Sequence, residues 1–325
     1  MRLDTASGVE AVRKQVAEFF ALQIRRYGEI VNAPGCTGNY IKNSENCLAC
    51  FHCYDSEDSK YGVHVWRNAK DCVDVDTAGR NAERVYNSIN AGIDVSNYLC
   101  VSLCWTCSFM EYSYYCFNSN RCFGSVGLRK KDYCILNRQY PKGEYEKLRA
   151  EIIAKMREAG EYGEFFPPAV SAFGYNESAA QERFPFTKEE ALAKGFKWEE
   201  YPRGTFDKET VLWNDVPDSI REVDEKAMLK EIFGCVQCKK NYLITPDEMT
   251  FYKRLEIPLP RLCPDCRHRR RFMARGPNRL WHRRCMCKGG HFHGDQPCPN
   301  EFETTYSPDR PEIVYCEKCY QSEVV

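Results

Sequence analysis

Two cysteine pairs in the last third of the chain have the spacing of a metal site. They are Cys235-x-x-Cys238 and Cys263-x-x-Cys266. Two such pairs on one short segment can supply four thiolates to a single tetrahedral zinc ion. A segment of this length cannot build much apolar core, so the metal would supply most of its folding free energy. The alternative, two reduced pairs without metal, is disfavoured by the paired spacing.

The residues between the pairs predict a strand and a helix that would position them. Residues 241–245 indicate a short hairpin arm, and a helix is expected next. Thr245 and Glu248 fit a capping box, with Pro246 at the first helical position. The prolines of residues 257–260 would end this helix before the second cysteine pair. We therefore predict a treble-clef-like or ribbon-like zinc module in residues 231–275.

A second set of cysteines in residues 276–325 predicts another module of this kind. Cys316-x-x-Cys319 is a further pair, and Cys298 is the obvious third thiolate. The fourth ligand is open among three residues, namely Cys287, Cys285 and His293. The first of these is favoured because thiolate binds zinc more tightly than a competing imidazole in most sites. We expect two structural zinc ions, one for each module. A second module in which neither cysteine candidate is a ligand is the alternative.

The only strongly basic run of the chain lies within residues 267–284. One interpretation is phosphate contact, since arginine clusters beside a zinc site can bind a nucleic-acid backbone. The other is pairing with acidic residues such as Glu301, Glu303 and Glu312. The net charge of zero, from 46 basic and 46 acidic residues, favours pairing. The candidate nucleic-acid ligands are Arg267, Arg269, Arg270, Arg271, Arg283 and Arg284.

Residues 36–140 have the composition of a repeat domain. They are rich in Cys, Ser, Asn and Tyr, and small residues recur at every third position around Cys50. Later, soft residues recur at every sixth position: Cys104, Met110, Cys116, Cys122, Leu128 and Cys134. A parallel β-solenoid explains this pattern, since small inward residues stack on the same position of the next coil. We expect about four coils, with a helix in residues 1–35 capping one end and a helix near residues 145–156 capping the other.

The cysteines of this repeat domain could be packed or bound to metal. Cys47, Cys50 and Cys53, and the pair Cys104 and Cys107, have ligand-like spacing. In a strand, however, residues three apart point to opposite faces unless a corner intervenes. We therefore expect buried thiols that pack as small hydrophobes, and keep metal binding as the alternative.

The composition fits a protein of two or three domains that does not enter a membrane. The chain has 325 residues, 43% of them hydrophobic, and no apolar run long enough to span a bilayer. No apolar signal core follows the first residues, so a cytoplasmic location is expected. The expected divisions are residues 1–35 (N-terminal helix and cap), 36–140 (solenoid), 141–230 (helical and irregular connection), 231–275 (first zinc module) and 276–325 (second zinc module).

Local patterns predict further elements. An amphipathic helix is expected over residues 9–29, and a second helix over residues 143–160. Thr187 and Glu190 fit a capping box for a short helix, with Gly195 after its end. The remaining predicted elements are a helix over residues 221–233 and a hairpin of residues 302–306 and 313–315.

Several stretches resemble known zinc modules. Phe233-Gly-Cys-Val-Gln-Cys238, residues 246–252 and residues 257–267 look like the zinc-ribbon or treble-clef module of many bacterial proteins, and residues 302–320 resemble a second one. With the cysteine-rich repeats and residues 127–137, the chain is similar to uncharacterised zinc-binding proteins of candidate-phyla bacteria. The resemblance implies structural zinc in both modules and no known activity. Some of these proteins carry a further zinc finger before the repeats, so a shorter form is expected here.

These observations favour a non-enzymatic scaffold whose expected partner is another protein. Sites made only of thiolates leave no open position for a substrate, unlike catalytic zinc. Nucleic-acid binding through residues 267–284 is the first alternative. A zinc-dependent enzyme is the second, with His291 and His293 beside an open site. Some similar proteins carry a CoA-transferase label, but this sequence has neither a glycine-rich nucleotide-binding turn nor alternating α and β elements.

Overall fold

The computed structural model describes residues 2–201 and 203–325, and it divides into two compact units. The first unit comprises Met1–Ile24, Ser171–Pro277 and Pro311–Ile313, and the second comprises Arg25–Val170, Asn278–Arg310 and Val314–Val325. The first cysteine-rich module therefore shares a unit with the N-terminal helix, and the second module shares a unit with the repeat domain. Within the described residues, none of the helices combines the length and the apolar character needed to cross a bilayer.

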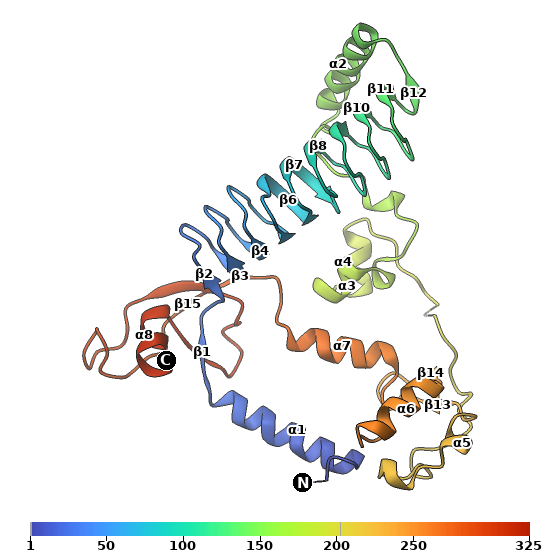
Figure 1. Ribbon diagram of the computed structural model, residues 1–325, viewed down its shortest axis with the longest axis vertical. Coiled ribbons are helices and arrows are strands. Elements are labelled where there is room, and N and C mark those ends of the chain that lie inside the picture. Colours follow the sequence, from blue (N-terminus) through green and yellow to red (C-terminus); the bar gives the residue numbers. More distant parts are fainter. Residues whose placement is uncertain (1, 202) are drawn as a thin grey trace. The chain divides into compact units, whose positions relative to one another are not determined.

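The second unit is built on a parallel β-solenoid, which confirms the predicted fold class (Figure 1). Nine consecutive parallel pairings join its strands, and paired residues are usually 12 apart, as in Gly38 with Cys50 and Met110 with Cys122. The prediction of about four coils is wrong, because the structure has about nine. The strands are β2 (Ile30–Val31), β3 (Gly38–Lys42), β4 (Cys50–Tyr54), β5 (Val63–Val65), β6 (Lys70–Ala78), β7 (Ala82–Ile89), β8 (Val95–Leu99), β9 (Ser108–Glu111), β10 (Asn120–Phe123), β11 (Asp132–Ile135) and the antiparallel β12 (Arg138–Gln139).

A three-residue unit explains both the length of a coil and the recurrences in the sequence. Through most of the solenoid every third residue has a positive φ, as in Thr106, Phe109 and Tyr112, and these left-handed residues turn the chain. Another residue of each unit points inward and is buried, as Cys104 and Cys107 are. Four such units make a coil of about 12 residues. The recurrence at six residues therefore spans half a coil, so it cannot be used to count coils.

Inward cysteines and serines supply hydrogen bonds between coils as well as volume. The Cys116 N–H donates to Cys104 Sγ at 3.3 Å, and the Ser125 N–H donates to Ser113 Oγ at 3.2 Å. The Ser113 hydroxyl donates in turn to the Glu111 carbonyl at 2.9 Å. A buried N–H without a partner is costly, so a small side chain with an acceptor atom is favoured at these inward positions.

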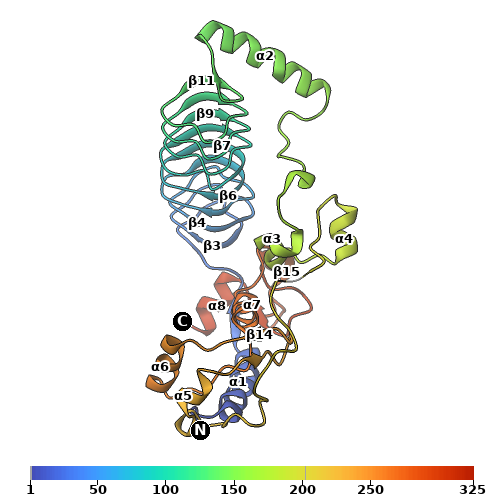
Figure 2. The ribbon, with the colours of Figure 1, turned by 90° about the vertical axis from the view of Figure 1, so that its right-hand side faces the viewer.

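A helix packs against the last coils of the solenoid (Figure 2). This is α2 (Lys142–Glu158), the helix expected over residues 143–160, and Tyr145 and Ile153 are its buried residues. Both belong to a cluster with four buried solenoid residues, namely Cys100, Tyr112, Phe123 and Ile135. Arg149 Nη2 donates to Glu111 Oε1 at 2.9 Å, which pairs the carboxylate of a buried glutamate. The turn η1 (Pro168–Val170) follows further on.

The first coils contact the last part of the chain. β15 (Trp281–Arg284) and β16 (Glu301–Thr304) form an antiparallel pair, and β16 lies against β3. Asn39 Nδ2 donates to Thr305 Oγ1 at 3.1 Å, and both residues are buried. The Thr304 hydroxyl donates to the carbonyl of Tyr27 at 2.6 Å. The second module is therefore fixed to the beginning of the solenoid.

The hairpin predicted between residues 302–306 and 313–315 is wrong. β16 pairs with β15, whereas β17 (Ile313–Tyr315) pairs with β1 (Ile24–Arg26). The sequence pattern indicated two short extended stretches correctly, but it could not identify partners that lie far away in the chain. The helix α8 (Glu317–Glu323) follows β17 directly.

Two helices of the first unit differ from the prediction. α1 spans Ala6–Ala21, so the helix expected over residues 9–29 ends earlier, and none of its residues is buried. Its N-cap is Thr5, whose hydroxyl oxygen accepts from the Gly8 N–H at 3.1 Å, and Ser7 Oγ donates to Asp218 at 2.5 Å. The helix expected over residues 221–233 is wrong, because only η3 (Ile220–Glu222) and α5 (Glu225–Met228) form there. Asp224 separates them, since its carboxylate caps α5.

Other local predictions in the first unit are confirmed. Thr187 and Glu190 form the capping box of α4 (Lys188–Ala193), and Thr245 and Glu248 form that of α6 (Pro246–Arg254). The core of this region packs aromatic and aliphatic side chains around Phe233. The remaining elements are η2 (Tyr175–Glu177), α3 (Ala179–Arg183), β13 (Phe233–Gly234), β14 (Asn241–Tyr242) and α7 (Pro264–Ala274).

Candidate metal centres

The structure brings together the four cysteines that the sequence assigned to the first site. The sulfurs of Cys235, Cys238, Cys263 and Cys266 all lie within 4.8 Å of one another. The Cys238 and Cys263 sulfurs are 3.6 Å apart. Tetrahedral zinc with Zn–S bonds of about 2.3 Å separates its sulfurs by about 3.8 Å, so this group could hold a metal ion with little adjustment.

Two secondary-structure ends position these thiols. Cys235 directly follows β13, and the turn after it closes when its N–H donates to the Lys240 carbonyl at 3.0 Å. Cys263 is the N-cap of α7, and Cys266 lies in the first turn of that helix. The Cys263 N–H donates to Cys235 Sγ at 3.3 Å. A strand end and a helix start therefore bring the two pairs to one point.

The surroundings of Cys235 favour its thiolate. Burial raises the pKa of this thiol, but the backbone N–H groups of Cys238, Cys263 and Gln237 bond to the sulfur, and they lower the pKa to about 6. Burial and the neighbouring thiols raise the pKa of Cys266 instead. Backbone N–H groups, together with the Cys238 thiol, therefore stabilise one negative charge, while Cys266 ionises readily only beside a positive charge such as a metal ion.

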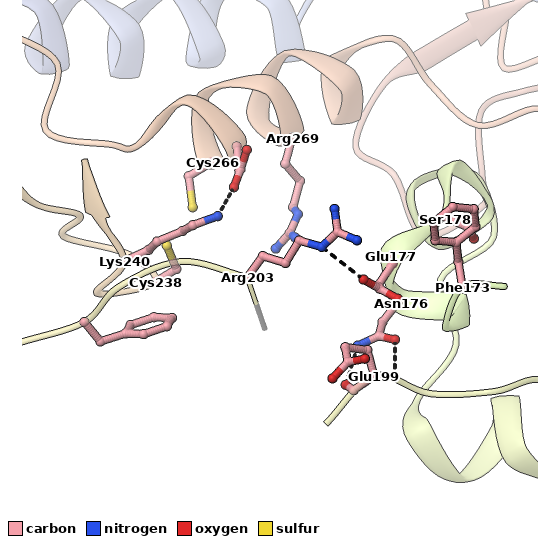
Figure 3. Close-up of a pocket in the computed structure, with 12 residues that line it drawn as sticks. Phe173, Asn176, Glu177, Ser178, Glu199, Arg203, Cys238, Lys240, Cys266 and Arg269 are labelled. Carbon is pink, nitrogen blue, oxygen red and sulfur yellow. Dashed lines mark hydrogen bonds and ion pairs between the residues drawn. The ribbon is translucent and has the colours of Figure 1, made fainter. Parts of the chain in front are cut away.

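A cleft of about 710 Å³ in the first unit borders this site (Figure 3). Cys238 and Cys266 contribute to its lining. Two of its cations have acidic neighbours: Lys240 Nζ lies 2.7 Å from Asp265, and Arg203 lies 3.3 Å from Glu177. Arg269 is a third cation in the lining. The cleft therefore presents paired charges beside the thiols.

A second group of four thiols lies in the second unit. Its members are Cys285, Cys298, Cys316 and Cys319, all buried and all within 4.8 Å of one another. The Cys298 and Cys316 sulfurs are 3.9 Å apart, which again suits a tetrahedral ion bound by thiolates. Three of these residues were assigned to this site from the sequence, and Cys285 takes the position for which Cys287 was favoured.

The two thiol groups are built in the same way, which explains the position of Cys285. Cys285 directly follows β15, as Cys235 follows β13. Cys316 is the N-cap of α8, with Cys319 in its first turn. The Cys316 N–H donates to Cys285 Sγ at 3.2 Å, which repeats the N–H to sulfur bond of the first group. The signal that sequence reasoning missed is a cysteine placed immediately after a strand.

Cys287 and His293 lie beside the second thiol group. Cys287, His293 and Cys319 have ligand atoms within 4.8 Å of one another, and so do Cys287, His291 and Glu323. The alternative ligands considered from the sequence are therefore close to the four thiols without belonging to that set.

The solenoid thiols do not form such groups. Among the described residues, none of the sets that could hold a metal ion includes a solenoid cysteine. The Cys47 and Cys53 sulfurs are 3.6 Å apart. Burial raises the pKa of Cys72 to about 12 and the pKa of Cys100 to about 11, so these thiols stay protonated at neutral pH.

The arginines of residues 267–284 are divided between the two units. Arg267 lies on α7, where it donates to Glu248 at 2.9 Å and to Tyr252 at 2.7 Å. The next three arginines of α7 are exposed, and one of them, Arg270, lies 3.8 Å from Glu10. The exposed arginines of α7 are Arg269, Arg270 and Arg271, and the exposed Arg275 is the C-cap of the helix.

The arginines of β15 form contacts within the second module. Arg284 Nε donates to Glu301 at 2.6 Å, the acidic pairing considered from the sequence. Arg283 donates to the Ser307 carbonyl at 3.2 Å. Glu303 pairs with His282 at 3.0 Å rather than with an arginine. These side chains therefore hold the β15–β16 ribbon together.

Comparison with known proteins does not assign the chain to a family. None of the protein-family models matches the chain, and the search of curated proteins found no match. The resemblance to bacterial zinc-binding proteins therefore stays a prediction.

Proposed function

We propose that the protein is a zinc-stabilised scaffold that binds another protein through its solenoid. The observation that carries this proposal is the pair of four-thiol groups with one common construction. Each group joins a strand end to a helix start within a small module. All-thiolate donors at these separations suit Zn²⁺, a borderline-soft ion that accepts tetrahedral geometry without strain.

The ligand sets support a structural role for both ions. Four thiolates complete a tetrahedral shell, so no position is left for water or substrate. Three of the four sulfurs in the first group and all four in the second belong to buried residues. An ion enclosed in this way contributes folding free energy to its module.

An aromatic patch on the solenoid supports a protein partner. Trp105, Tyr114, Tyr115 and Phe117 form a chain of ring contacts with centroids 5.0 to 6.2 Å apart. Arg129 lies over the Phe117 ring at 4.9 Å. The first three of these aromatic side chains are exposed. Aromatic residues and arginine are enriched in protein interfaces and in the residues that dominate binding energy.

The zinc part of the proposal is tested by native mass spectrometry of the full chain. Cys263→Ser should remove one zinc ion, and Cys298→Ser should remove at least one. Cys104→Ser in the solenoid is the matched control and should remove none. A chain that binds no zinc, or that loses zinc in the control alone, would contradict the proposal.

The partner part is tested by site-specific crosslinking in cells that produce the protein. A photoreactive phenylalanine analogue at Tyr115 should give a defined protein adduct. The same analogue at Tyr61, an exposed tyrosine outside the aromatic patch, is the control and should not. Equal adducts at both positions would show non-specific contact and contradict a partner site on the patch.

A second candidate function is nucleic-acid binding through α7. Its exposed residues 268–271 are one histidine and three consecutive arginines, a local positive charge on a neutral chain. If α7 contacts phosphates, binding should weaken steeply with salt, and the triple change of Arg269, Arg270 and Arg271 to Ala should weaken it further. The control replaces Arg80, Arg84 and Arg129 of the solenoid. If both triple changes weakened nucleic-acid binding equally, the binding would be non-specific charge attraction and not a site on α7.

A further inference from the structure

One face of α8 and the loop before β16 bring five potential ligands together. Cys319 and Glu323 are four residues apart on α8, so they lie on the same face. His293 Nε2 lies 3.5 Å from Cys319 Sγ, and His291 Nε2 lies 2.7 Å from Glu323 Oε2. Cys287 is close to both pairs, since its sulfur is within 4.8 Å of the ligand atoms of each.

The loop is folded so that its two histidines point at this face. The His291 N–H donates to the Gly289 carbonyl at 2.9 Å, and the Gly294 N–H donates to the His291 carbonyl at 3.0 Å. Gly294 has a φ of +62°, a conformation that other residues rarely adopt. A Cβ on Gly289 would lie 3.3 Å from His291 Nε2, so the imidazole ring packs closely against this glycine.

The hydrogen bonds of His293 show which ring nitrogen carries the proton and which carries the lone pair. Its Nδ1 lies 2.6 Å from the Gln296 carbonyl oxygen, which can only accept, so Nδ1 carries the proton. In neutral imidazole Nε2 then has a free lone pair, and this lone pair points at Cys319. A carbonyl partner on the far nitrogen is the outer contact that orients histidine ligands in metal sites. A lone pair facing a metal-bound thiolate is repulsive unless a cation lies between them.

We propose that Cys287, His293 and Cys319 hold an additional zinc-type ion beside the second four-thiol group, with Cys319 shared between the two ions. The separation of 3.5 Å between His293 Nε2 and Cys319 Sγ is close to the N–S spacing of about 3.6 Å across a tetrahedral zinc ion. Thiolate and imidazole donors together suit Zn²⁺ or its spectroscopic substitute Co²⁺.

This ion differs in kind from the two structural ions. Three protein ligands leave its fourth position for water or another small ligand, which is the arrangement of catalytic zinc. The His291 and Glu323 pair lies next to Cys287, one of the three proposed ligands. The proposal rests on the zinc proposed for the second four-thiol group, and it adds a reactive centre to a module otherwise stabilised by a closed site.

The first test is the metal count of the intact full chain, measured by native mass spectrometry after loading with Zn²⁺. The wild-type chain should hold three ions, whereas His293→Ala and Cys287→Ser should each hold two. His282→Ala, a change of an exposed histidine on β15 in the same module, is the matched control and should hold three. Two ions in the wild-type chain would overturn the additional ion and leave the proposed function standing. Fewer than two would remove the proposed function itself.

The second test detects the open coordination position and does not depend on a count. In the Co²⁺-loaded chain, added azide should change the visible absorption spectrum of the wild-type protein. His293→Gln should abolish this change, while the intense thiolate-to-cobalt bands of the four-thiol groups remain and show that the module is folded. An azide response that persists in His293→Gln, or that is absent from the wild-type chain, would overturn the proposal.

Discussion

The solenoid and the C-terminal modules use cysteine in opposite ways. In the modules, eight cysteines form two four-thiol groups whose sulfurs face one another. In the solenoid, inward cysteines lie in a repeating coil, and thiols such as Cys104 accept hydrogen bonds from the backbone of the next coil. The same side chain is therefore a ligand candidate in one region and a packed hydrogen-bonding group in the other.

The comparison shows that the Cys-x-x-Cys spacing is not sufficient to identify a metal site. Cys104 and Cys107 have the same spacing as Cys263 and Cys266. In α7 the pair spans a helix N-cap and first turn, which puts both sulfurs on one side. In the solenoid a left-handed residue, Thr106, stands between them, so the two thiols belong to successive inward positions of a coil. Local backbone conformation therefore decides whether a Cys-x-x-Cys pair can bind one metal ion or forms two packed inward thiols.

The largest expected effect is the response of the two regions to metal removal. Stripping the protein with a strong chelator should unfold both C-terminal modules, because structural zinc contributes on the order of 10 kcal/mol to small zinc domains. The solenoid should stay folded, since none of the candidate metal groups among the described residues includes a solenoid cysteine. Hydrogen exchange followed by mass spectrometry should therefore show lost protection in residues 231–275 and 281–323, and retained protection in residues 63–111. Uniform protection, or uniform loss, would contradict the division of roles.

Thiol reactivity should separate the same two regions. After chelation, iodoacetamide at pH 8 should label the module cysteines within minutes, because unfolding exposes them. The solenoid thiols Cys72 and Cys104 should react only in denaturant, since they are buried and their raised pKa keeps them protonated. Peptide mapping gives the extent of labelling at each site. Rapid native labelling of Cys72 or Cys104 would show that the solenoid interior is not closed.

Substitution of one solenoid cysteine should reveal its hydrogen-bonding role. Cys104→Ser keeps an acceptor atom for the Cys116 N–H, as inward serines do elsewhere in the solenoid, and should cost less than about 1 kcal/mol of unfolding free energy. Cys104→Val keeps the volume but leaves that N–H unpaired, and should cost about 1–3 kcal/mol. Urea unfolding of both variants measures the difference. If valine were tolerated as well as serine, packing alone would explain the solenoid cysteines.

The sequence was informative where a signal is local and weaker where it depends on distant partners. The capping boxes at Thr187 and Thr245 are short patterns, and each appears in the structure. The cysteine pairs were predicted from their spacing as ligands, but the helices that begin at Cys263 and Cys316 were not predicted. The preference for Cys287 over Cys285 failed to match the observed group because the deciding feature is the end of β15. That strand is fixed by pairing with β16 across an irregular loop.

The number of coils could not be predicted from the sequence for a different reason. The recurrences at three and six residues were visible, but ordinary strand alternation was the wrong rule for them. A left-handed residue at every third position, as at Phe109 and Tyr112, makes four short sides per coil. Such conformations are unfavourable for most residues and are stabilised only by the stacked coils, so single-residue preferences do not reveal them.

The smallest expected effect concerns Glu248, whose polar contacts support the first module and do not include the four-thiol group. Its carboxylate joins the capping box of α6 to Arg267 of α7. Burial raises the pKa of this carboxyl, but hydrogen bonds from Arg267, Tyr252 and the Thr245 N–H lower it by more than burial raises it. The net pKa therefore lies below the ordinary value of 4.5. Glu248→Gln should therefore cost about 1 kcal/mol at neutral pH.

The stability lost in Glu248→Gln should depend on pH, in a direction that follows from the lowered pKa. A lowered pKa in the folded protein contributes stability above the unfolded value near 4.5, and this stability is lost as the pH falls through the folded pKa. The difference in unfolding free energy between wild-type protein and Glu248→Gln should therefore shrink below about pH 5. Glu256→Gln, which breaks an exposed pair with Arg221, is the matched control and should show little cost at any pH. Thiolate protonation at low pH affects all three proteins equally, so it cancels in these differences. If the stability lost in Glu248→Gln grew towards low pH, the Glu248 carboxylate would not stabilise the module in its ionised form.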